Sequence, residues 1–251
     1  MAIAAGHAHL VAIDERGRVW TWGQGAFGRL GQGDDEDQPE PALVAPAEGL
    51  CSPVMASAGW HTAVLASDGE SWLCGAGDFG QLGHGDSTSK LLLTRLSKGL
   101  FGKLPLMMVA CGGSHTVALT QIGSVWTFGN GADGQLGLGE SVRRMGVSQP
   151  TLVSGELQDI VVEYVAAGFA FSLAVSETGE VFTWGKGADG RLGHDNEEDQ
   201  VLPRALGRER FGGGKVVQVA AGVAHSAALT TQVISYHIMC MYVCMYVCMY
   251  V

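Results

Sequence analysis

Four glycine-rich segments are the first candidates for chemistry in this sequence of 251 residues. The pattern G-x-G-x-x-G-x-L-G occurs at residues 23–31, 75–83, 129–137 and 185–193. Its first six positions match the glycine fingerprint that holds a dinucleotide pyrophosphate at the N-terminus of a helix. In each case Leu-Gly and a polar loop follow, where a helical pattern would be needed. We therefore reject nucleotide binding and expect no cofactor.

Other patterns that carry catalysis or bind metals are missing from the sequence. Residues 212–215 read Gly-Gly-Gly-Lys, but Val216 follows where a phosphate-binding loop needs Ser or Thr. Neither H-E-x-x-H nor G-x-S-x-G occurs. Cys51, Cys74 and Cys111 stand singly, which is typical of reduced cysteines in the cytosol or nucleus. We expect no catalytic residue, no metal site and no enzymatic activity.

Histidine recurs at one position of a longer repeat. It occurs as His9, His61, His115 and His225, and Phe171 takes its place at the fourth occurrence. A catalytic group would occur once, whereas a group repeated in every unit is structural. We predict buried rings, each bonded to a neighbouring backbone carbonyl.

The glycines keep fixed distances from this histidine position in units one to four. They stand 8, 14, 19 and 22 residues after it. The structural positions of the glycine-rich segments are Gly23, Gly28, Gly31, Gly75, Gly80, Gly83, Gly129, Gly134, Gly137, Gly185, Gly190 and Gly193. Self-similarity at such a period indicates a repeat architecture. The core of the unit is rigid in length, and the connections between units vary.

Each unit has the pattern of four short strands. In the first unit, apolar residues 10–13 and 19–22 flank a turn that ends in glycine, which predicts a β-hairpin. A strand-like stretch precedes the hairpin, most clearly at 160–165, and another follows it near a proline, as at 150–153. Four strands in about 50 residues are one propeller blade. We predict an all-β fold.

The repeats resemble those of the regulator of chromosome condensation family. The shared motifs are A-G-x-x-H-[ST]-x-x-L, then [VW]-x-x-W-G, then G-Q-L-G-x-G, and they cover roughly residues 1 to 230. Members fold as seven-bladed propellers, and they serve as exchange factors for a small GTPase, as the plant ultraviolet-B receptor and as interaction modules of HECT-type ubiquitin ligases. Here Gly59-Trp60-His61-Thr62 lacks the arginine of the receptor's G-W-R-H-T motif. That departure speaks against a photoreceptor.

The resemblance stops near Thr231, so we predict about four blades and a partial fifth in an open or imperfectly closed propeller. The array comprises residues 1–231, with units at about 4–55, 56–108, 109–164, 165–218 and a partial 219–231.

Residues 232–251 form an apolar tail of low complexity. Residues 240–251 read Cys-Met-Tyr-Val three times, which is the translation of a TGTA tetranucleotide repeat. We interpret the tail as microsatellite-derived. The alternatives are a membrane anchor over 233–251, a metal or palmitoylation site at Cys240, Cys244 and Cys248, and an aggregation-prone strand. We expect no membrane association.

The net charge indicates which class of partner the chain could bind. The net charge of −10 argues against direct nucleic-acid binding, which depends on Lys and Arg at the phosphates. Two acidic runs follow the glycine segments of units one and four and should lie on one face. The candidate partner-facing residues are Asp34, Asp35, Glu36, Asp37, Glu197, Glu198 and Asp199. Both runs lack the central glycine of a calcium loop, so we interpret them as solvated loops that attract a basic protein surface.

The sequence thus predicts a non-enzymatic module for protein–protein interaction or regulation, in the cytoplasm or nucleus. Two alternatives stay open. One is guanine-nucleotide exchange on a small GTPase, which would need a protruding wedge loop. The other is a fragment of the propeller of a HECT-type ubiquitin ligase.

Overall fold

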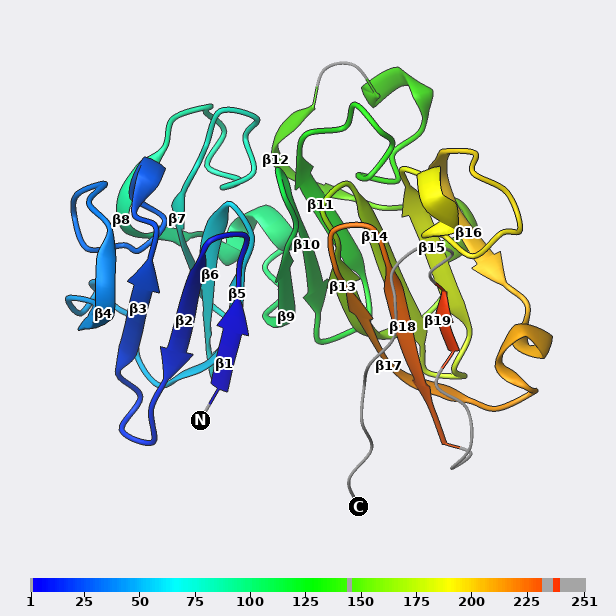
Figure 1. Ribbon diagram of the computed structural model, residues 1–251, viewed down its shortest axis with the longest axis horizontal. Helices are drawn as coiled ribbons and strands as arrows, with labels where there is room; N and C mark the ends of the chain where they lie inside the picture. Colours follow the sequence, from blue (N-terminus) through cyan, green and yellow to red (C-terminus); the bar gives the residue numbers. More distant parts are fainter. Residues whose placement is uncertain (1, 144–145, 232–236, 240–251) are drawn as a thin grey trace.

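The computed structural model describes residues 2–143, 146–231 and 237–239, which fold as five antiparallel sheets (Figure 1). Blade 1 contains β1 (Ala2–Ala5), β2 (His9–Ile13), β3 (Val19–Gly23) and β4 (Gln38–Leu43). Blade 2 contains β5 (Pro53–Ala58), β6 (His61–Ala66), β7 (Ser71–Gly75) and β8 (Lys90–Leu96). Blade 3 contains β9 (Leu106–Cys111), β10 (His115–Thr120), β11 (Val125–Gly129) and β12 (Val147–Leu152). Blade 4 contains β13 (Val162–Ala167), β14 (Phe171–Ser176), β15 (Val181–Gly185) and β16 (Gln200–Leu206). Blade 5 contains β17 (Val216–Ala221), β18 (Ser226–Thr230) and β19 (His237–Met239).

Short 3-10 helices lie in the connections. They are η1 (Ala26–Gly28), η2 (Lys98–Phe101), η3 (Glu140–Val142), η4 (Gly155–Leu157), η5 (Ala188–Gly190) and η6 (Arg208–Phe211). The glycine-rich segments are therefore loops between the third and fourth strands of blades 1 to 4, and no α-helix follows any of them in the described residues. This arrangement lacks the helix N-terminus that a dinucleotide site requires.

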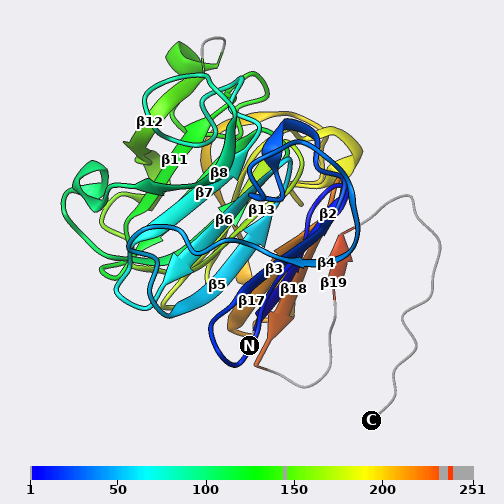
Figure 2. The same cartoon turned by 90° about the vertical axis from the view of Figure 1, so that its left-hand side faces the viewer.

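The blades stand around one axis, with the first strand of each blade innermost. Strand β1 contacts β5, β5 contacts β9, β9 contacts β13, and β13 contacts β17. Figures 1 and 2 show the five sheets side by side in chain order, each twisted about its strands. This is the predicted propeller-type array of four blades and a partial fifth.

Burial along the second strands shows which blades have neighbours on both faces. Every residue of β6, β10 and β14 is buried, whereas β2 alternates between buried and half-buried positions. A strand covered on both faces needs apolar or paired side chains at every position, and a strand covered on one face needs them at every second position. Blade 1 is the end of the array in the described residues, so its alternation follows from its place.

Apolar cores fill the spaces between successive blades. Between blades 1 and 2, for example, Val11 and Ile13 pack with Val64 and Trp72, which are all at most 2% exposed. Equivalent clusters lie between blades 2 and 3, 3 and 4, and 4 and 5. Each blade is therefore held mainly by its neighbours, as in other repeat proteins.

The predictions for the tail fall almost entirely outside the described residues. Of residues 232–251, only 237–239 are described, and they pair with β18 as the third strand of blade 5. The interpretations of Cys240, Cys244 and Cys248 concern residues beyond that part of the chain. In the described residues, we find no helix of the length and apolar character that a membrane span needs.

Candidate functional site

The four loops that contain the glycine-rich segments emerge at one end of the blades. These long loops comprise residues 24–37, 76–89, 130–146 and 186–199. The turns between the first and second strands lie at the same end, because alternate strands of each blade run antiparallel (Figure 1). We call this end the long-loop face. The opposite end, with the hairpin turns and the connections between blades, is the turn face.

The long-loop face carries most of the negative charge of the chain. The four long loops hold 13 acidic and 5 basic residues, which give −8 of the net −10. Such a one-sided distribution raises the local concentration of basic partners and speeds their association. The two acidic runs found in the sequence account for only part of this charge. Asp78, Asp86, Asp133 and Glu140 of the middle loops add to it and were missed.

The predicted acidic residues differ in whether their carboxylates bond within the loops or face solvent. The side chains of Asp37 and Asp199 close their loops, since each Oδ1 accepts the backbone N–H of a glycine, Gly25 and Gly187 respectively, at 2.9 Å. Ser89 takes this role in the second loop. The carboxylate of Asp199 also pairs with the guanidinium of Arg143 at 2.6 Å. These two carboxylates support the loops and are only in part available to a partner.

The remaining carboxylates of the two runs face solvent. Asp34 accepts the N–H of Glu36 in a local turn. Asp35, Glu36, Glu197 and Glu198 are exposed, and within the described residues none of their carboxylates forms an ion pair. These four are the carboxylates of the predicted set that are freest to meet a basic surface.

The repeated histidines join one blade to the next. Nε2 of His9 lies 2.6 Å from the hydroxyl of Thr62, and Nε2 of His61 lies 2.6 Å from the hydroxyl of Thr116. The third pair is His115 and Ser172, at 2.9 Å. Each hydroxyl in turn donates to a backbone carbonyl of the preceding long loop, namely that of Arg29, Gln81 or Gln135. The prediction of a direct bond to a carbonyl was wrong, because the hydroxyl of the following blade lies between.

This chain of hydrogen bonds fixes the proton on the imidazole. A carbonyl can only accept, so each hydroxyl spends its proton there and must accept from Nε2–H. Burial lowers the pKa of His9 to about 4, with Arg29 nearby adding to the effect. Burial lowers the pKa of His61 to about 3 and that of His115 to about 4. The rings are therefore neutral at physiological pH, and their hydrogen bonds join neighbouring blades.

The contact between blades 4 and 5 is built differently. Phe171 occupies the histidine position and is fully buried. Ser226 still donates to the carbonyl of Arg191 at 2.9 Å, and the guanidinium of Arg191 lies 5.9 Å from the centre of the Phe171 ring. The hydroxyl–carbonyl bond thus recurs at all four contacts between described blades, whereas the imidazole occurs at three. The fourth of the repeated histidines, His225, is exposed, which corrects the prediction that it is buried.

Glycine is required where these rings meet the backbone. A Cβ on Gly112 would overlap the His115 ring and lie 2.6 Å from the carbonyl oxygen of Gly168. At Gly129, where β11 ends, φ is 111° and a Cβ would lie 2.5 Å from the carbonyl oxygen of Ser114. Glycine alone tolerates both the positive φ and the close approach. The twelve glycines of the glycine-rich segments all have a positive φ, although a Cβ on Gly190 would meet nothing within 4 Å.

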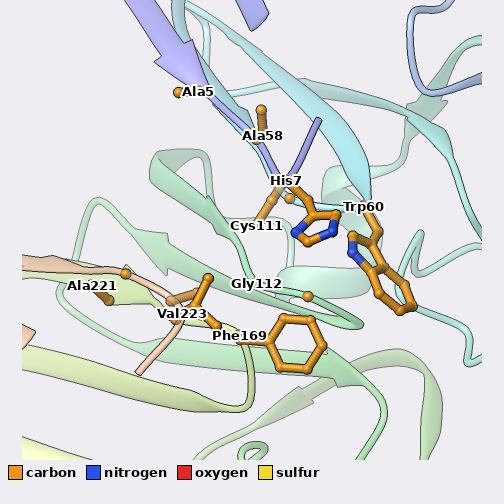
Figure 3. A pocket seen from close by; sticks show the side chains of 15 residues that line it. Ala5, His7, Ala58, Trp60, Cys111, Gly112, Phe169, Ala221 and Val223 are labelled. Atoms are coloured by element: carbon orange, nitrogen blue, oxygen red, sulfur yellow. The ribbon is translucent and has the colours of Figure 1, made fainter. Parts of the chain in front are cut away.

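A pocket opens at the axis on the long-loop face, lined by the turns between first and second strands of all five blades (Figure 3). Its volume is about 160 Å³. The side chains of His7, Trp60 and Phe169 lie together on one side, and Val223 lies nearer the other (Figure 3). Trp60 is in edge-to-face contact with both other rings, at centroid distances of 5.9 Å to His7 and 5.6 Å to Phe169.

Sequence reasoning missed this pocket and two exposed aromatic residues. Phe27 and Phe79 are 50% and 47% exposed in the first and second long loops. The signal was present, since both occupy the same variable position of the glycine pattern, where the third and fourth loops have Asp133 and Asp189. In the described residues, we find no cluster of three or more His, Cys, Asp or Glu side chains placed to hold a metal.

Fold and site together define a propeller-type repeat protein in which a hydroxyl–carbonyl bond recurs at each contact between described blades. The model of the regulator of chromosome condensation (RCC1) repeat matches residues 16–65, 68–119, 123–175 and 178–229. The chain belongs to this family, which confirms the resemblance seen in the sequence.

The curated relatives of the chain are longer proteins. It is 39% identical over 231 residues to the E3 ubiquitin-protein ligase HERC2 of Homo sapiens, covering 90% of this chain and 5% of that protein. It is 32% identical to the ultraviolet-B receptor UVR8 of Arabidopsis thaliana, covering 91% of this chain and 50% of the receptor. The chain thus spans at most half the length of these two relatives.

Solved structures confirm the fold. The crystal structure of human WBSCR16 aligns with a TM-score of 0.81 and 26% identity, over 92% of this chain and 57% of that one. Prp20p from Saccharomyces cerevisiae aligns with a TM-score of 0.78 and 23% identity, over 90% of this chain and 54% of that one. The relatives in the family have different functions, so the fold alone assigns none.

Proposed function

We propose that this chain is a non-enzymatic protein-interaction module whose long-loop face binds a basic protein surface. The observation that carries the proposal is the charge of that face, −8 over four loops. Asp35, Glu36, Glu197 and Glu198 present the freest carboxylates, and the exposed rings of Phe27 and Phe79 stand among the loops. Acidic loops steer and orient a basic partner, and exposed aromatic residues are typical interface anchors.

Structural relatives support a protein as the partner. Prp20p is described with binding to Gsp1p and histones, and yeast RCC1 (Prp20) is described bound to Kap60. At 20–23% identity this likeness supports the fold and a protein-binding use of it, without a particular partner or an exchange activity. We propose the cytoplasm or nucleus as the location, where single thiols such as Cys74 and Cys111 stay reduced.

In the experiment, the full chain is titrated with a short lysine–glycine peptide. Calorimetry measures the binding at low and at physiological salt. We expect saturable binding that weakens as salt rises, because exposed charges are screened. A glutamate–glycine peptide of equal length is the control and should not bind. Equal binding of both peptides, or no binding of the lysine peptide at low salt, would contradict the proposal.

A second candidate follows from the 39% identity to HERC2. In that case the same face would recruit a protein to a ubiquitin ligase. An antibody against this chain should then precipitate, from cells that express it, an activity that transfers ubiquitin to a lysine substrate in the presence of the upstream ubiquitin enzymes. A precipitate that contains the chain and transfers no ubiquitin would count against this candidate and leave the interaction module standing.

A further inference from the structure

The axial pocket has an uncharged lining, although it lies on a charged face. The five lining turns contain no Asp, Glu, Lys or Arg, and the side chains they contribute are aromatic or aliphatic apart from Cys111. The rings of His7, Trp60 and Phe169 form a continuous row through their edge-to-face contacts. An apolar aromatic pocket therefore lies at the centre of an otherwise acidic face.

The third blade leaves room for this row. Gly113 stands where the other blades have His7, Trp60, Phe169 and Val223. A Cβ on Gly113 would lie 2.6 Å from the carbonyl oxygen of Phe169 and 2.9 Å from its ring. The ring of Phe169 can thus lean across blade 3 towards Trp60. The turns are also tied together by backbone bonds, from Gly113 N–H to the Phe169 carbonyl at 3.1 Å and from Phe169 N–H to the Gly222 carbonyl at 3.3 Å.

The size of the pocket suits one side-chain head group. Its volume of about 160 Å³ is close to that of an apolar cavity of about 150 Å³ that accommodates benzene in another protein. Phe169 and Val223 are 38% and 60% exposed, so the pocket is open to a partner that approaches along the axis. The long loops, whose charges sum to −8, favour a cation over a neutral or acidic group on this face.

We propose that this axial pocket takes an arginine side chain from a basic segment of a partner protein, with the guanidinium against the rings of Trp60 and Phe169. The proposal rests on the proposed function and deepens it by naming the anchor. Cations bind the faces of aromatic rings, Trp most strongly, and arginine does so more often than lysine because its planar group is more weakly hydrated. The acidic loops bring the segment to the face, and the pocket selects the residue.

The test uses two peptides of one sequence, with a central arginine or a central citrulline flanked on each side by glycine and lysine. Citrulline has nearly the same shape as arginine and no charge. The readout is the ¹H–¹⁵N signal of the Trp60 indole in the full chain, assigned by its loss in Trp60→Phe. We expect the arginine peptide to shift this signal saturably, and the citrulline peptide to bind about 5- to 30-fold more weakly.

Matched variants locate the site. Phe169→Ala should weaken the arginine peptide by about 5- to 30-fold and leave the citrulline peptide within twofold. Ile122→Ala removes an exposed apolar side chain from the turn face, where it is 58% exposed, and should leave both affinities within twofold. Thermal unfolding of each variant shows whether it is folded. His7→Ala, which truncates an exposed ring, is the second pocket variant.

The outcomes separate this inference from the function on which it rests. Salt-dependent binding with an unmoved Trp60 signal, or equal affinity of the two peptides, overturns the arginine pocket and leaves the acidic face standing. Absence of binding by either peptide at low salt overturns both. A shift of the Trp60 signal that Phe169→Ala weakens and Ile122→Ala does not would establish the pocket.

Discussion

The two ends of the blades differ in net charge. The long loops carry 13 acidic and 5 basic residues, whereas the turns and connections of the opposite end carry 10 and 7. Ion pairs form at both ends in the described residues. On the long loops six acidic side chains have basic partners, namely Asp86, Asp133, Glu140, Asp189, Asp195 and Asp199, and on the turn face Asp14 and Glu70 do. The buried carboxylate of Glu70 pairs with Arg95 at 2.9 Å and with Lys98 at 3.1 Å, and Asp14 pairs with Arg18 at 2.7 Å.

The difference teaches which end is built for a partner. The two cations beside Glu70 lower the pKa of its carboxyl below the usual value. Because ion pairs occur at both ends, the difference lies in the excess of acidic residues, which gives −8 in the long loops and −3 on the turn face. Accumulated like charges repel one another and lower the stability of the isolated protein. Their presence on the long-loop face is understandable if a basic surface neutralises them.

A single methyl group should distinguish the packing at the two ends. Gly112→Ala, on the long-loop side, places a Cβ into the His115 ring and 2.6 Å from the Gly168 carbonyl oxygen. We expect the free energy of unfolding to fall by about 3 kcal/mol. Gly99→Ala, on the turn face, meets only the Ser97 hydroxyl at 3.3 Å and should cost under about 0.5 kcal/mol. Urea unfolding measures both, and equal losses would refute the asymmetry.

Removal of the hydroxyls between blades should lower the free energy of unfolding, and by more where the hydroxyl also binds an imidazole. Thr116→Val leaves both the Nε2–H of His61 and the carbonyl of Gln81 without their partner, which we expect to cost about 2 to 3 kcal/mol. Ser226→Ala affects only the carbonyl of Arg191 and should cost about 1 kcal/mol. Thr178→Val on the turn face is the exposed control. If Ser226→Ala proved as costly as Thr116→Val, the imidazole would have no part in joining the blades.

Acid should loosen the histidine contacts. The folded pKa values of His9, His61 and His115, at about 3 to 4, lie below the ordinary value of 6.5. The unfolded chain therefore takes up protons first as pH falls, so stability is full above about 6.5 and declines from there towards about 4. His115→Phe copies the Phe171 contact. The free energy of unfolding of this variant should fall by about 2 kcal/mol less than that of the parent between pH 7 and pH 5. An identical pH slope in the variant and the parent would contradict this assignment.

The sequence predicted the fold well because the glycine positions are dictated locally. Gly129 needs its positive φ and its close approach in any blade, so its spacing reveals the blade. The partner of each histidine was harder to predict, because His61 and Thr116 are 55 residues apart and meet only when blades stack. A hydroxyl residue after the histidine position in units two to five was the available signal. The pocket could not be predicted from the sequence, because Trp60 and Phe169 come from different blades and meet only in the folded protein.

The most direct test of the central claim neutralises equal charge at the two ends. One variant combines Asp35→Asn, Glu36→Gln, Glu197→Gln and Glu198→Gln on the long-loop face. The other combines Glu15→Gln, Glu48→Gln, Asp159→Asn and Glu177→Gln on the turn face, so that both have the same net charge. We expect the first to bind the lysine–glycine peptide about tenfold more weakly at low salt, and the second to bind within twofold of the parent. Equal weakening in both variants would show that net charge alone attracts the peptide, and it would contradict a partner-binding long-loop face.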